Sequence, residues 1–87
     1  MYFLDYYYLR CRSITYAQRV VRTLDKGGIH GWVVKLPSRG ISEGCGYSVK
    51  IAGYKLYPAL DIIRQNRLEL VGIYAVGDDG IPYEVRP

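Results

Sequence analysis

The chain has 87 residues, of which 49% are hydrophobic, so it can bury one small core but not two. Charged residues make up 23%, which excludes the class of disordered chains. We therefore expect residues 1–87 to form a single domain. The formal net charge of +4 invites a nucleic-acid partner. Basic residues are scattered along the chain, however, and the aromatic-glycine signature of RNA-recognition strands is absent, which disfavours that partner.

The sequence holds two cysteines and one histidine, which fit neither a disulfide scaffold nor a zinc site with four closely spaced ligands. We expect no metal and no other cofactor. Residues 1–6 lack the basic region of a signal peptide, and no apolar run reaches membrane-spanning length. These features predict a cytoplasmic protein without a membrane partner.

Hydrophobic spacing and turn residues predict the elements in chain order. They are a strand over 6–12, a helix capped by Ser13 and ended by Gly27 and Gly28, strands over 29–36 and 47–51, a helix over 56–66, a strand over 70–76 and a short edge strand over 81–85. The order β-α-β-β-α-β predicts an α+β fold, a ferredoxin-like sandwich with two helices on one face of an antiparallel sheet. The expected strand order is 4-1-3-2, with a short extra C-terminal strand.

Tyrosines mark the sheet face that points away from the helices. Alternation along the first strand places Tyr6 and Tyr8 there, and Tyr74 on the fourth strand joins them, with Leu70 nearby. A two-layer sandwich leaves this face without a covering layer. We therefore expect a homodimer whose interface includes Tyr6, Tyr8 and Tyr74.

A polar loop over residues 37–46 holds Cys45 between Gly44 and Gly46. Glycines on both sides allow positive φ and expose the sulfur, and Arg39 could stabilise a thiolate, which is the reactive form. This pattern indicates an activated thiol. The alternative interpretation is a tight turn with an incidental cysteine.

The expected topology brings Cys11, at the end of the first strand, next to the start of the third strand, just after Cys45. The positive end of the first helix lies at the same edge, where it would lower the pKa of a thiol. Counting back by twos from Ile51 places Cys45 in phase with Cys11 on the helix-facing side. Cys11 is thus a possible second thiol within disulfide reach of Cys45; the other interpretation is a small core residue that only packs.

The features around this loop resemble a small bacterial family of selenium or sulfur carrier-like (Se/S carrier) proteins, a domain of unknown function by origin. The matching positions are Tyr7 and Tyr8, Ser13, Ile29, Arg39, Ile41, Ser42, Cys45, Gly46 and Gly72-Ile73-Tyr74. The resemblance covers about residues 6–76. Two positions depart from the family pattern: Ser38 stands where a proline usually precedes the arginine, and Glu43-Gly44 replaces two small hydroxyl-type residues.

The resemblance implies a carrier that holds a persulfide or perselenide on Cys45 and has no turnover of its own, hence no enzyme. Arg39, Ser42, Gly44 and Gly46 would support the loop. The implied partners are proteins, a donor and an acceptor of sulfur or selenium, and the choice between the two elements stays open. The alternative is a non-catalytic regulatory or protein-interaction module with an incidental thiol, and a third option is an RNA-binding sheet.

Overall fold

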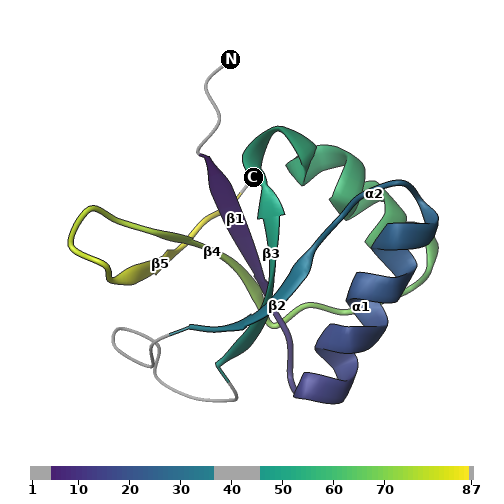
Figure 1. Ribbon diagram of the computed structural model, residues 1–87, viewed down its shortest axis with the longest axis horizontal. Coiled ribbons are helices and arrows are strands. Elements are labelled where there is room, and N and C mark those ends of the chain that lie inside the picture. Colours follow the sequence, from purple (N-terminus) through teal and green to yellow (C-terminus); the bar gives the residue numbers. More distant parts are fainter. Residues whose placement is uncertain (1–4, 37–45, 87) are drawn as a thin grey trace.

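The computed structural model describes residues 5–36 and 46–86 (Figure 1). Within these residues the chain forms five strands, two α-helices and one 3₁₀ turn. Their bounds are β1 Tyr6–Arg10, α1 Ile14–Lys26, β2 Trp32–Lys35, β3 Tyr47–Ala52, η1 Gly53–Lys55, α2 Leu56–Gln65, β4 Gly72–Val76 and β5 Pro82–Glu84.

Local sequence signals set the ends of α1. The side chain of Ser13 accepts a hydrogen bond from the Tyr16 N–H at 3.1 Å, which satisfies one of the amides left open at a helix start. At the other end Gly28 adopts φ 83°, a conformation that favours glycine. Both predicted ends of this helix are confirmed.

The strands form one antiparallel sheet in the order β2-β3-β1-β4-β5. The predicted neighbours are therefore confirmed, because β1 lies between β3 and β4, and β2 lies outside β3. The short C-terminal strand is present as β5 and pairs with β4 across the turn that contains Gly80, with φ 78°.

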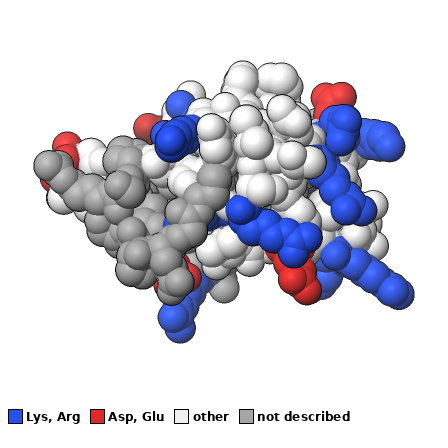
Figure 2. Space-filling view, turned by 90° about the horizontal axis from the view of Figure 1, so that it is seen from below, with Lys and Arg blue, Asp and Glu red and all other residues white. Residues whose placement is uncertain are grey.

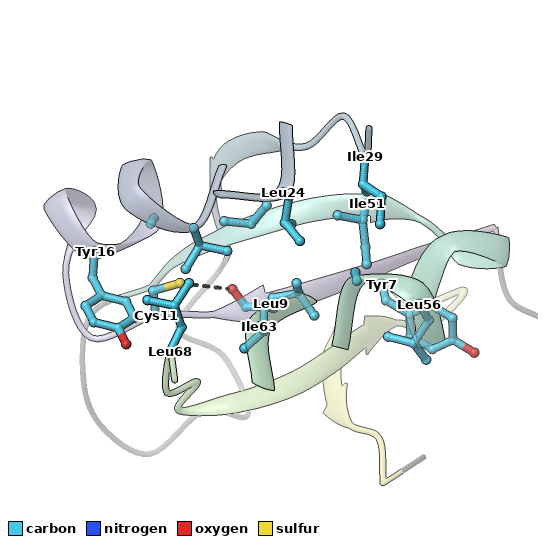
Figure 3. Close-up of a cluster of buried hydrophobic side chains, with 14 residues drawn as sticks. Tyr7, Leu9, Cys11, Tyr16, Leu24, Ile29, Ile51, Leu56, Ile63 and Leu68 are labelled. Carbon is cyan, nitrogen blue, oxygen red and sulfur yellow. Dashed lines mark hydrogen bonds between the residues drawn. The ribbon is translucent and has the colours of Figure 1, made fainter. Parts of the chain in front are cut away.

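The core lies between the sheet and both helices (Figure 3). Alternate residues of β1 and β3 point into it: Leu9, Val49 and Ile51 have no exposed surface. Each helix adds a stripe to the same cluster, Leu24 from α1 and Ile63 from α2 among them. Both helices therefore pack on the same face of the sheet, and the opposite face carries no helix (Figure 1).

Several details of the sequence-based prediction are wrong. The first strand ends at Arg10 rather than at Arg12, and the fourth begins at Gly72 rather than at Leu70. Leu70 does not lie exposed on the open face; it is partly buried and packs against the core. The second strand begins at Trp32 rather than at Ile29, because the Ile29 N–H bonds to the Leu24 oxygen at 2.9 Å and so belongs to the end of α1.

Candidate functional site

The predicted site splits between described and undescribed residues. Cys45 and its supporting residues Arg39, Ser42 and Gly44 lie outside the described residues. Gly46 and Cys11 are described. The structure thus gives the frame from which segment 37–45 departs, and we call this frame the loop base: Leu36, Gly46, Tyr47 and Cys11.

Leu36 and Gly46 form the two sides of the loop base. The Leu36 N–H donates to the Gly46 oxygen at 2.7 Å, which continues the β2–β3 ladder by one step. A side chain at position 46 would place its Cβ only 2.8 Å from the Leu36 oxygen. Among the described glycines, those with positive φ are Gly28 and Gly80. Gly46 is therefore required for close backbone approach, and the expectation that it takes positive φ is wrong.

Cys11 joins β1 to the loop base. Its N–H donates to the Tyr47 oxygen at 3.0 Å, and its Sγ–H donates to the Leu9 oxygen at 3.4 Å. The residue has no exposed surface. Figure 3 shows its sulfur within the core, with Tyr16 and Leu68 near it. The predicted face of Cys11 is confirmed, and in this position the thiol packs among apolar side chains and is inaccessible to a protein partner.

The N-terminus of α1 lies beside the loop base, because only Cys11, Arg12 and Ser13 separate it from β1. The first turn of the helix contains no acidic side chain. The positive end of the helix dipole is therefore not neutralised by its own residues, and it favours an anion at this edge of the sheet.

Basic side chains add to this positive charge. Arg12 stacks on the Tyr16 ring with its Cζ 4.5 Å from the centroid, and the Lys35 Nζ lies 5.7 Å from the centroid of Tyr47. Neither cation forms an ion pair with a described acidic residue. Figure 2 views this end of the molecule, and Lys and Arg predominate over Asp and Glu on its described part. An electropositive setting of this kind stabilises a thiolate.

The predicted tyrosines share the helix-free face of the sheet. Tyr8 lies directly opposite Tyr74 across the β1–β4 pair. Tyr6 is 44% exposed, and the Nζ of Lys50 lies 4.1 Å from the centroid of its ring. A shallow hollow of about 360 Å³ lies here, lined by Tyr6, Trp32, Val33, Val34 and Lys50.

Sequence reasoning missed Lys50 as part of this face. The signal was available: Lys50 stands between the buried Val49 and Ile51, so a period of two places it on the opposite side. Glu84 was missed as well, and its place depends on the pairing of Tyr74 with Glu84, which the sequence does not show.

The comparison with protein families identifies the family of this chain. The model of the family described as "Putative Se/S carrier protein-like" matches residues 6–75. The chain belongs to this family. The match spans β1 to β4 with both helices, and it includes segment 37–45 with Cys45. The search of curated proteins gave no match. The search of solved structures gave none either.

Residues 5–36 and 46–86 contain neither a metal-binding cluster nor a membrane-spanning helix. No cluster of three or more His, Cys, Asp or Glu side chains there is arranged to hold a metal ion. Of the helices formed by residues 5–36 and 46–86, none has the length and apolar character needed to cross a membrane.

Proposed function

We propose that this Se/S carrier protein-like chain carries sulfur or selenium on Cys45 between a donor and an acceptor protein. The observation that supports the proposal most is the family match over residues 6–75, which contains the Cys45 loop. The proposal includes the ferredoxin-like classification of the fold, supported by the order of the elements and the strand order β2-β3-β1-β4-β5.

The charge around the loop base also supports this role. The N-terminus of α1, Arg12 and Lys35 supply positive charge, and the first turn of α1 has no acidic side chain to cancel it. A Cys45 thiolate close to the loop base would be stabilised by these groups. A persulfide on Cys45 is an anion, as the thiolate is. The same positive groups would therefore stabilise both the unloaded and the loaded form of the carrier.

The transfer step conserves atoms and electrons. The Cys45 thiolate attacks the outer sulfur of a persulfide on the donor enzyme. A new bond forms between the Cys45 sulfur and that outer sulfur, the donor's S–S bond breaks, and the donor thiolate leaves. No external oxidant or reductant takes part, and a perselenide would pass by the same exchange.

The test is intact mass spectrometry after incubation with a cysteine desulfurase and free cysteine. We expect the added mass of one sulfur atom, removed by dithiothreitol and located on Cys45 by peptide mapping. Cys45→Ser should abolish the addition, and Cys11→Ala, the matched control, should retain it. A protein whose Cys45 reacts with iodoacetamide but never gains sulfur would contradict the proposal.

The exposed sheet face favours the second candidate, a non-catalytic interaction module with an incidental thiol. Tyr6 and Trp32 expose 44% and 47% of their surfaces on this face. The two candidates differ in their dependence on the thiol. A module would keep its partner binding in Cys45→Ser, whereas a carrier would lose its cargo.

A further inference from the structure

The helix-free face of the sheet is the largest surface that the proposed thiol chemistry does not use. Both helices pack against the other side of the sheet. The exposed aromatic rings of Tyr6 and Trp32 lie on this face, whereas Arg10 and Ser48, farther along the same face, are buried, with the Arg10 Cζ 5.8 Å from the centroid of Tyr74. Apolar surface of this kind marks an interaction site.

The strand register orders the charges on this face. One row runs across four of its strand pairs, because Trp32 pairs with Lys50, Lys50 with Tyr8, Tyr8 with Tyr74 and Tyr74 with Glu84. The row therefore has a cation towards the β2 edge, two tyrosines in the middle and a carboxylate at the β5 edge. A row with opposite charges at its two ends is complementary to a reversed copy of itself.

Both charged groups of the row are available to a second molecule. Among the described residues Lys50 forms no ion pair, and its Nζ rests on the ring of Tyr6. A Cβ built on Gly72 would lie 3.4 Å from Oε2 of Glu84, which places this carboxylate over the open face. Its one described ion pair, with Arg86 at 3.8 Å, joins side chains that are 48% and 89% exposed and is therefore weak.

We propose that two copies of this chain associate through this face, around a twofold axis that runs roughly along the strands between β1 and β4. In this arrangement Tyr8 meets the partner's Tyr74, and Lys50 meets the partner's Glu84. The interface is isologous, so each of these contacts occurs twice. The sheets pack in the aligned manner of β-sandwiches, and the charge pairs fix their register.

The pattern favours a second copy over an unrelated partner. An unrelated protein has no reason to require a cation and a carboxylate placed symmetrically about the Tyr8–Tyr74 pair. A nucleic acid would be repelled by Glu84 at the end of the row. The association also stands apart from the thiol chemistry, because none of these side chains belongs to the loop base.

Analytical ultracentrifugation of the full chain over a wide concentration range tests the proposal. We expect a reversible dimer, weakened on the order of tenfold or more by Lys50→Glu and equally by Glu84→Lys, because each change places like charges in contact twice. The double variant K50E/E84K should restore the dimer. An equimolar mixture of the two single variants should form a heterodimer, since all its charge contacts are then between opposite signs.

Matched variants separate this interface from a general effect of charge. Lys26→Glu makes the same charge change at an exposed position in the last turn of α1 and should leave the dimer intact. Arg86→Ala removes the intramolecular partner of Glu84 and should also leave it intact. Cys45→Ser should dimerise as the wild type does, even if the carrier function fails. A wild type that stays monomeric at millimolar concentration, or charge swaps without rescue in variants folded by circular dichroism, would overturn the proposal.

Discussion

The hydroxyl of Tyr16 accepts a hydrogen bond from the backbone N–H of Glu69 at 2.6 Å, across 53 positions of sequence. Tyr16 lies in the first turn of α1, and Glu69 lies in the segment that leads from α2 to β4. The same ring carries the guanidinium of Arg12 on its face, and only 9% of the residue is exposed. Tyr16 thus links the start of α1 to the chain that enters β4, next to the loop base.

Removing this hydroxyl should lower the free energy of unfolding. In Tyr16→Phe the ring remains, but the Glu69 N–H loses its acceptor, so we expect a loss of about 1 kcal/mol. Urea denaturation followed by circular dichroism measures it. Tyr54→Phe is the control, because Tyr54 is 69% exposed and no described group bonds its hydroxyl. Equal losses in the two variants would contradict the assigned role.

A methyl group at position 46 should disturb the loop base. In Gly46→Ala the new Cβ meets the Leu36 oxygen at 2.8 Å, and a backbone carbonyl within the sheet cannot move aside. We expect a destabilisation of about 1–3 kcal/mol. Gly77→Ala is the matched control, since its nearest atom, at 3.0 Å, is a carboxylate oxygen of the exposed Asp79, which accepts a bond from the Ile81 N–H within a surface turn and not within the sheet. The argument fails if Gly46→Ala unfolds at the same urea concentration as the wild type.

These two residues show what the sequence could predict. The cap at Ser13 and the strand phase of Cys11 depend on near neighbours, and both predictions are confirmed. The contact of Tyr16 with Glu69 depends on how α1 and α2 pack, which no local pattern encodes. Gly46 was read correctly as a special position but for the wrong reason, because the approach of Leu36 belongs to the β2–β3 pairing.

On the open face, too, the sequence predicted what depends on near neighbours and missed what depends on strand pairing. The sequence placed Tyr8 and Tyr74 on one face, and their direct pairing bears this out. It did not place Lys50 and Glu84 in the same row, because that row depends on the register of four strand pairs. The role of Cys45 stays a prediction, since the residue lies outside the described part of the chain.

The cations at the loop base should control the reactivity of Cys45. If Arg12 and Lys35 stabilise its thiolate, the double variant R12E/K35E should raise the pKa of the Cys45 thiol, because two positive charges become negative. The rate of iodoacetamide labelling at neutral pH should then fall, and the midpoint of the rate against pH should move upward. Arg64→Glu, remote in sequence and paired with Asp61, is the control and should change neither quantity. If the midpoint is unchanged in the double variant, Arg12 and Lys35 do not activate Cys45 electrostatically.

Oxidation tests whether Cys11 is a second thiol for Cys45. The Cys11 amide bonds to Tyr47, two positions after Cys45, and a disulfide needs Cα atoms within about 7 Å. We predict that mild diamide treatment of dilute protein yields an internal Cys11–Cys45 disulfide, seen as a monomer that has lost two hydrogen atoms. Because Cys11 has no exposed surface, the bond should form slowly and faster in low urea, which opens the core transiently.

Cys11→Ala is the matched control for this reaction. It retains Cys45 but lacks the internal partner, so oxidation should give only covalent dimers through Cys45. The wild type gives the same dimers if the two sulfurs do not meet. In that case Cys11 acts only through its packing beside Leu9 and its amide bond to Tyr47, and Cys45 reacts alone. The chain would then offer only Cys45 to a partner, because Cys11 is buried in the core whereas the sequence around Cys45 is polar.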